Sequence, residues 1–146
     1  MIRGLLLALL AIATPVTAEW STGGTAEVPL DGNGGGWLVH ATVNGKVRGL
    51  FLLDTGATYC VVGPSTARKL GLAGGPQQAE LRTANGTVRV PVVTLATIDV
   101  GGNRARDVTA VVHAAIDPPI DGIIGLSYLN NFRYAVDPRR RVLRLK

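Results

Sequence analysis

The chain has 146 residues, enough for one domain with one sizeable hydrophobic core. Apolar residues make up 47% of the sequence and charged residues 17%, which excludes an intrinsically disordered chain, and its 19 glycines favour a turn-rich all-β domain. The formal net charge is +5, but the basic residues gather at the C-terminal end without interleaved aromatic residues, so a solvated basic edge or attraction to an anionic surface fits better than nucleic-acid binding.

Residues 1–18 are predicted to form a secretory signal peptide. Arg3 is the only charge, an apolar stretch covers residues 4–13, and Val16-Thr17-Ala18 resembles a small-residue cleavage site. The alternative is an uncleaved membrane anchor, but ten helical residues rise about 15 Å, roughly half the thickness of a hydrocarbon core. The segment therefore predicts an exported protein, periplasmic or otherwise extracytoplasmic, which contacts a membrane only if residues 1–18 are retained.

The next segment, 19–35, ends in a glycine cluster that no helical pattern follows, which indicates a flexible connection and not a phosphate-binding loop. Two strands are predicted after it, over 37–43 and 47–53. The dipeptide Asn44-Gly45 between them is a strong signal for a two-residue hairpin. The second strand leads directly into Asp54.

The stretch Asp54-Thr55-Gly56-Ala57 places a carboxylate between two apolar segments. Burial of a carboxylate is costly unless the group is paired or shares a proton. Thr55 offers a hydroxyl donor, and Gly56 lets another backbone approach closely. A structural Asx turn at the end of a strand has the same residue types, so these residues alone do not establish a function.

A short strand is expected over 58–62 and a short helix over 65–70, with Ser65 as its N-cap and Gly71 as the left-handed residue after its end. A long hairpin follows, with strands over 79–84 and 87–100. Its turn, Asn85-Gly86, is predicted to be type I′, with positive φ at both residues. Period-two alternation predicts one buried face on the second strand. That face comprises Val88, Val90, Val92, Ala96, Ile98 and Val100.

The last third of the chain begins with a strand over 105–114 that ends before Pro118-Pro119. Ile123-Ile124-Gly125 predicts a short buried strand that passes close to another backbone, followed by a short helix over 126–131. Two strands, 132–136 and 141–145, are predicted around Asp137-Pro138. The last strand is expected at the edge of a sheet, with residues 28–30 as its neighbour.

Thiol, metal and nucleotide chemistry have little support in the sequence. Cys60 is the only cysteine, so no intramolecular disulfide can form, and only His40 and His113 could serve it as a base. A small buried apolar role for Cys60 is the better interpretation. No metal-binding spacing or nucleotide fingerprint is present, and Gly125-Leu126-Ser127-Tyr128-Leu129 lacks the second glycine of a nucleophile elbow.

Three motifs, in this order and at this spacing, resemble the retropepsin-like (clan AA) aspartic proteases, in particular small bacterial proteins with an N-terminal signal or anchor segment. They are Leu53-Asp54-Thr55-Gly56-Ala57-Thr58, the hairpin tip Thr83-Ala84-Asn85-Gly86, and Ile123-Ile124-Gly125 before a short helix. The resemblance covers residues 36–146. It implies one all-β domain there, a closed barrel or sandwich with one or two short helices.

The resemblance also implies an aspartic endopeptidase that works as a homodimer, because one chain supplies a single Asp-Thr-Gly. Two Asp54 carboxylates about 3 Å apart would share one proton and activate a water to attack a peptide bond, without a metal or another cofactor. Residues 82–88 lack the aromatic side chain of two-lobed pepsin-like flaps, which favours the dimeric branch. The other implied site residues are Thr55, Gly56 and Ala57 in the active-site loop, Ala84, Asn85 and Gly86 in a flap, and Ile123, Ile124 and Gly125 packed behind the loop.

A non-catalytic function on the same fold is the alternative. An extracytoplasmic module of this kind would bind extended peptides, or assemble with other proteins, by β-strand addition in its groove. The presence of Asp54, Thr55 and Gly56 together favours the peptidase, because a binding module could lose the carboxylate at little cost.

Overall fold

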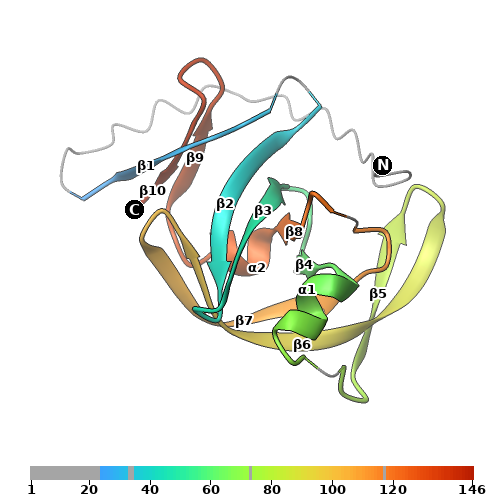
Figure 1. Ribbon diagram of the computed structural model, residues 1–146. Helices are drawn as coiled ribbons and strands as arrows, with labels where there is room; N and C mark the ends of the chain where they lie inside the picture. Colours follow the sequence, from blue (N-terminus) through green and yellow to red (C-terminus); the bar gives the residue numbers. More distant parts are fainter. Residues whose placement is uncertain (1–23, 33–34, 73, 117) are drawn as a thin grey trace.

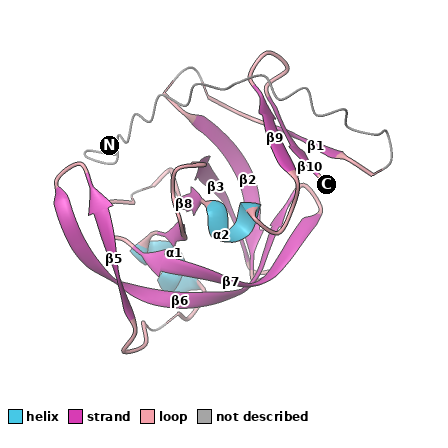
Figure 2. Ribbon diagram, turned by 180° about the vertical axis from the view of Figure 1, so that it is seen from behind, coloured by secondary structure: helices cyan, strands magenta, loops and turns pink. Residues whose placement is uncertain are grey.

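The computed structural model describes residues 24–32, 35–72, 74–116 and 118–146, so the predicted signal segment 1–18 lies outside the described residues. Strands predominate, and the only helices of the described chain are two short ones (Figures 1 and 2). Neither of these helices is long and apolar enough to cross a membrane. In chain order the elements are β1 (Ala26–Pro29), β2 (Trp37–Val43), β3 (Val47–Leu53), β4 (Cys60–Val62), α1 (Pro64–Lys69), β5 (Gln78–Thr83), β6 (Gly86–Val100), β7 (Asn103–Val112), β8 (Gly122–Ile124), α2 (Leu126–Leu129), β9 (Tyr134–Asp137) and β10 (Val142–Leu145).

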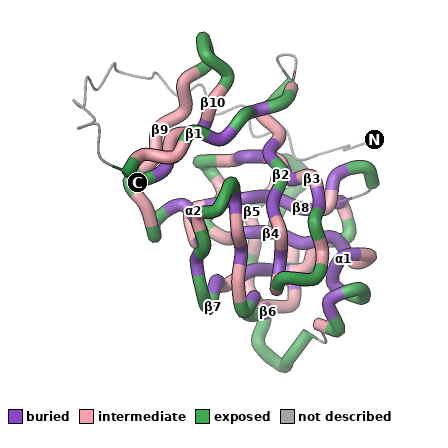
Figure 3. The backbone as a smooth tube through the Cα atoms, turned by 60° about the vertical axis from the view of Figure 1, so that its left-hand side comes forward, coloured by how far each residue is buried: buried purple, intermediate pink, exposed green. Residues whose placement is uncertain are grey.

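Six strands close into a barrel in the order β2-β3-β8-β4-β7-β6. The barrel closes where β6 pairs back onto β2, with Thr42 opposite Asp99 and Val43 opposite Ile98. Among the described strands β5 pairs with β6 alone, and the β5–β6 hairpin extends beyond the barrel wall (Figure 1). Buried residues concentrate in the barrel strands, whereas exposed residues gather at the turns and hairpin tips (Figure 3).

The hairpin that delivers Asp54 has the predicted form. β2 and β3 have the predicted ends and pair antiparallel over their full length, from Trp37 opposite Leu53 to Val43 opposite Val47. The turn between them has positive φ at both Asn44 (52°) and Gly45 (63°), the conformation that a two-residue hairpin of this kind requires. Most later elements differ from the predicted ends by one to three residues, as is usual at element boundaries.

The burial pattern predicted for the long strand is wrong in its middle. Val90, Val93, Leu95 and Ile98 are buried and Ala96 is exposed, so the inward face changes side between Val90 and Val93 and again between Leu95 and Ile98. The facing strand β7 makes the second of these changes between Ala105 and Val108, where Asp107 has a φ of +52°. We attribute this local irregularity to the bend that closure of a small barrel requires.

A separate three-stranded sheet joins the two ends of the described chain, in the order β1-β10-β9. The predicted pairing of residues 28–30 with the last strand is confirmed, since Val28 lies opposite Leu143. Two expectations are wrong here: part of the supposedly flexible segment 19–35 forms β1, and β10 is the central strand, not an edge. The free edges belong to β1 and β9, and Pro29 removes one backbone donor from the first of them.

Glu27 ties β1 to the β9–β10 hairpin. The guanidinium of Arg140 donates hydrogen bonds of 2.6 and 2.8 Å to the two carboxylate oxygens, and Nε of Arg144 lies 3.4 Å from one of them. The hydrogen bond from Arg140 lowers the pKa of Glu27. Because the folded-state pKa is lowered, this contact stabilises the sheet at neutral pH and is lost only as the pH falls through that lowered value.

Two local predictions about turns and caps are also wrong. Helix α1 begins one residue earlier than expected, with Gly63 as N-cap and Pro64 in the first turn, so Ser65 does not cap it. At the tip of the β5–β6 hairpin, Thr83 pairs with Gly86, which makes Ala84 and Asn85 the loop residues. Of the turn residues 83–86 only Gly86 has positive φ (+110°), so the turn is not type I′.

Candidate active site

Asp54 stands at the end of β3, where three strand ends meet. β3 runs parallel to β8, with Leu52 opposite Ile123 and Leu53 opposite Ile124. The backbone N–H of Asp54 then donates a 3.0 Å hydrogen bond to the carbonyl of Ile124. The main chain of this half-buried acid is therefore held by β8, the strand that contains Ile123 and Ile124.

The loop that follows holds one oxygen of the carboxylate. The backbone N–H of Gly56 donates a 2.8 Å hydrogen bond to Oδ1 of Asp54, and the N–H of Ala57 donates to the Asp54 carbonyl at 3.2 Å. A Cβ built on Gly56 would lie 3.2 Å from Oδ1, so glycine allows the backbone to come this close. No described residue donates to Oδ2. Thr55, the next residue in the chain, is exposed.

The start of α2 holds the second half of the loop. The backbone N–H groups of Leu126 and Ser127 donate to the carbonyls of Ala57 (2.8 Å) and Thr58 (3.0 Å), and Oγ of Ser127 accepts from the N–H of Cys60 at 2.8 Å. From the sequence, Ser127 was considered only as a possible nucleophile, and its hydrogen bond to the backbone of Cys60 was not predicted. A serine just inside a predicted helix, two residues after a glycine that requires close backbone contact, is the signal that could have indicated it.

Gly125 makes this packing possible. A Cβ on Gly125 would lie 2.4 Å from the carbonyl oxygen of Tyr59 and 2.7 Å from that of Ala57, both distances that real side chains do not show. Ile123 and Ile124, the two residues that precede Gly125, are both buried. The structure therefore places Ile124 and Gly125 against the segment from Asp54 to Tyr59.

A second acid, Asp121, has a purely structural environment. Its Oδ2 accepts a 2.8 Å hydrogen bond from the N–H of Leu50, and its Oδ1 lies 3.3 Å from Oγ1 of Thr66. A Cβ on Gly49 would lie 2.5 Å from Oδ2, so this side chain fills the space that the glycine leaves. Asp121 joins β3 to α1 and does not line the groove beside Asp54.

The carboxylate of Asp54 opens into a groove of about 420 Å³ between the loop and strand β5 of the β5–β6 hairpin. The hairpin contributes Glu80 to Thr83, while the predicted flap residues Ala84, Asn85 and Gly86 lie beyond them at the tip and do not line the groove. The remaining wall is largely apolar. The lining residues are Asp54, Gly56, Ala57, Thr58, Tyr59, Val61, Glu80, Leu81, Arg82, Thr83 and Ile123.

The thiol alternative has no support from the geometry. Cys60 is buried in β4, and this burial raises the pKa of its thiol. Nδ1 of His113 accepts a hydrogen bond from the N–H of Ala115 (2.9 Å), and His40 lies 3.9 Å from Asp31. Neither histidine is hydrogen-bonded to Cys60 among the described residues. Within the same residues, no group of three or more His, Cys, Asp or Glu side chains could hold a metal ion.

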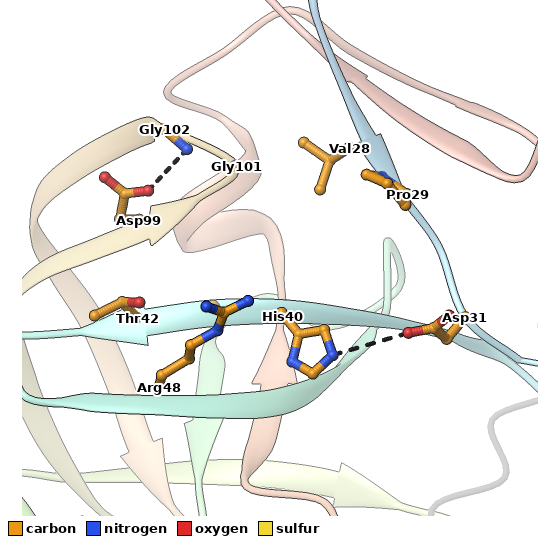
Figure 4. A pocket seen from close by; sticks show the side chains of 10 residues that line it. Val28, Pro29, Asp31, His40, Thr42, Arg48, Asp99, Gly101 and Gly102 are labelled. Carbon is orange, nitrogen blue, oxygen red and sulfur yellow. Dashed lines mark hydrogen bonds and ion pairs between the residues drawn. The ribbon is translucent and has the colours of Figure 1, made fainter.

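A second cavity, of about 390 Å³, separates β1 from the outer face of β2 and β3 (Figure 4). Most of its charged side chains already have partners in the chain: Asp99 lies 3.3 Å from Arg104 and accepts from the N–H of Gly102, and His40 faces Asp31. None of the residues that line this cavity lines the Asp54 groove. It is a cleft between the terminal sheet and the barrel, separate from the candidate active site.

Comparison with known proteins gives the fold and the family that the sequence motifs resemble. A family model described as "Aspartyl protease" matches residues 39–128. A similar solved structure is that of a retropepsin-like aspartic protease from Rickettsia conorii, with 24% sequence identity, a TM-score of 0.64, and coverage of 87% of this chain and 94% of that one. No curated protein sequence matches the chain. The predicted retropepsin-like all-β fold is confirmed by this structural match.

Proposed function

The chain belongs to the aspartyl protease family, and from this premise we propose that it is an endopeptidase whose active site joins Asp54 of one subunit to Asp54 of a second, identical subunit. One observation carries the proposal. Asp54 presents a carboxylate at the wall of a groove, with one oxygen held by Gly56 and the other without a donor among the described residues. Among the described acids near the site, Asp121 is committed to Leu50 and Thr66 and Glu80 faces Arg89, so we take the second carboxylate from another chain.

The chemistry follows from pairing the two carboxylates. Side by side, they hold a single shared proton, because two adjacent negative charges repel each other strongly. The ionised member takes a proton from a water held between them, and the protonated member donates a hydrogen bond to the peptide carbonyl as the tetrahedral intermediate forms. The exposed position of Thr55 suits a hydrogen bond across the dimer that keeps the two loops in register.

Cleavage of a denatured protein, with the products read by mass spectrometry, tests the proposal directly. The wild-type protein should produce discrete internal cuts at some pH between about 4 and 7, where a dyad with a raised upper pKa still holds one shared proton. A protein that binds extended peptides at this groove and releases them uncut would instead support the non-catalytic binding module.

The two-chain site predicts that activity depends on protein concentration. Because a monomer holds only half of the catalytic pair, specific activity should rise with concentration near the dimer dissociation constant and become constant above it. Dilution series of initial rates measure this, with sedimentation equilibrium on the same samples. Full activity at concentrations where only monomer sediments would contradict a two-chain site.

The three-stranded terminal sheet supports the proposed dimer, because it leaves backbone edges for a partner to extend. Among the described strands of that sheet, β1 and β9 each pair on one side only. The edge of β1 is interrupted by Pro29, which leaves β9 as the more complete edge for strand addition.

The β5–β6 hairpin is proposed to act as a flap over an extended substrate, which predicts the effect of Gly86→Val. Gly86 has a φ of +110° and open space around it, so valine there strains the backbone without a clash. We expect turnover to fall about tenfold while the free energy of unfolding falls by only about 1–2 kcal/mol. Initial rates and thermal melts of the purified variant measure the two effects.

Gly45→Val is the matched control for this prediction. Gly45 also has positive φ (+63°) and open space, but it lies at the tip of the β2–β3 hairpin, and no residue of that hairpin (37–53) lines the groove. It should cost similar stability and leave turnover per folded molecule unchanged. If Gly86→Val is folded, dimeric and as active as Gly45→Val, residues 83–87 have no part in the site.

An extracytoplasmic location is part of the proposal and rests only on the composition of residues 1–18. Sequencing the N-terminus of the protein recovered from cells distinguishes a cleaved signal peptide from a retained anchor. A start near residue 19 supports cleavage, whereas recovery of the full chain in the membrane fraction supports the anchor.

A further inference from the structure

Strand β5 of the flap hairpin carries two charged residues, Glu80 and Arg82, with different surroundings. β5 and β6 pair antiparallel, with Glu80 directly opposite Arg89 and Arg82 directly opposite Thr87. Nε and Nη2 of Arg89 lie 3.3 and 3.2 Å from the same carboxylate oxygen of Glu80. Glu80 therefore has a cationic partner within the hairpin, whereas the cross-strand neighbour of Arg82 is neutral.

No described residue forms a hydrogen bond or an ion pair with the guanidinium of Arg82, and this residue is exposed. It is the only cation among the groove-lining residues of the described chain. The two acids that line the same groove are accounted for otherwise: Glu80 faces Arg89, and Asp54 is held by its own loop. A guanidinium in this position has its hydrogen-bonding capacity free for a ligand in the groove.

The alternation along β5 separates two kinds of contact. Leu81 and Thr83 are half-buried, whereas Glu80 and Arg82 are exposed on the other side of the strand. An extended peptide lying along β5 would itself alternate, so some of its side chains pack on the apolar wall and others lie along the hairpin toward Arg82. A guanidinium pairs best with a carboxylate, which matches its planar, two-donor geometry.

We propose that Arg82 is a specificity-determining residue that selects peptides with a glutamate or aspartate within two residues of the cleaved bond. This inference rests on the proposed peptidase function and extends it by naming a substrate class. The contact is partly exposed to solvent, so the preference it provides is moderate, about fivefold in kcat/KM for glutamate over the uncharged isostere glutamine. It weakens with added salt, because solvent screens an exposed ion pair.

Three peptides that differ only at the selected position, with Glu, Gln or Lys there, test the proposal. The assay runs near pH 6, where a glutamate side chain is ionised. The wild-type enzyme should prefer Glu over Gln over Lys. Arg82→Gln should reduce the preference for Glu over Gln to near unity, and Arg82→Glu should make Lys the preferred residue while the Gln peptide is still cut.

Arg68→Gln is the control, because it removes one exposed cation from α1, away from the groove. It should keep the wild-type order of the three peptides. Equal kcat/KM for the Glu, Gln and Lys peptides in the wild-type enzyme, or an order unchanged by Arg82→Glu, would overturn the role of Arg82 and leave the peptidase function standing. Failure of the wild-type protein to cut any of the peptides or a denatured protein would count against the proposed function itself.

Discussion

Asp54→Asn is expected to lower peptide-bond cleavage by at least about 10³-fold, since both members of the proposed pair are lost together in the dimer and neither amide can take a proton from water. The fold should be unaffected. The amide oxygen of asparagine can still accept the hydrogen bond that the N–H of Gly56 donates, so the free energy of unfolding should change by less than about 0.5 kcal/mol. Cleavage rates and melting curves of the two proteins, compared at equal dimer concentration, measure both effects.

Asp121→Asn provides the matched control, because it makes the same change from acid to amide at the other carboxylate close to the core. Asp121 accepts from the N–H of Leu50 and contacts Thr66, so the loss of charge should cost about 1 kcal/mol of stability. Activity per folded molecule should stay within about twofold of wild type. Retained cleavage by Asp54→Asn, or its loss in a folded Asp121→Asn, would reverse the assignment.

Mixed dimers test whether Asp54 works in pairs. When wild-type chains exchange with an excess of Asp54→Asn chains, most wild-type chains enter dimers that hold only one carboxylate. The total activity should then fall well below that of the same wild-type chains alone. Activity that simply follows the amount of wild-type chain would indicate that each subunit acts by itself.

Gly125→Ala is expected to produce the second large effect, on stability and activity together. The added Cβ would come 2.4 Å from the carbonyl oxygen of Tyr59 and 2.7 Å from that of Ala57, and backbone atoms cannot move aside as a flexible side chain can. We expect a loss of about 3 kcal/mol in the free energy of unfolding. The shift is transmitted to the Asp54 loop, so turnover per folded molecule should fall by about 10²-fold.

Gly75→Ala is the control for Gly125→Ala. Its surroundings are open and its φ is not in the left-handed region, so alanine there should change neither stability nor turnover appreciably. Denaturant unfolding and initial rates measure both variants. A folded Gly125→Ala with wild-type turnover would show that close packing behind the loop is not needed to position Asp54.

Local sequence determined the hairpin that carries Asp54. Asn44 and Gly45 tolerate positive φ better than other residues, and that preference sets both the turn and the register of β2 on β3. Gly125 was predicted to lie against another backbone, and it does so, because glycine is the residue type that permits such an approach. These features depend on the conformational limits of single residues, which a sequence displays directly.

Patterns that depend on strand partners were predicted less well. Alternation along residues 87–100 could not reveal that the inward face changes side after Leu95, because the change follows from closing the barrel against β7. The last strand was expected at an edge and lies at the centre, since β1 pairs with its second side. Pairing of segments far apart in the chain leaves almost no signal in either segment alone.

The sequence by itself determined the residue types of the candidate site: an acid at the end of an apolar strand, a glycine beside it, and a close-packed segment far along the chain. Only the tertiary structure decided which groups are free to act. It commits Asp121 to Leu50 and Thr66, and it brings Oγ of Ser127 to the backbone N–H of Cys60. It gives Glu80 a partner in Arg89, whereas no described residue pairs with the side chain of Arg82. The physical reason is that the role of a charged or polar group depends on the donors and acceptors around it, and these come from elements that meet only when the barrel closes.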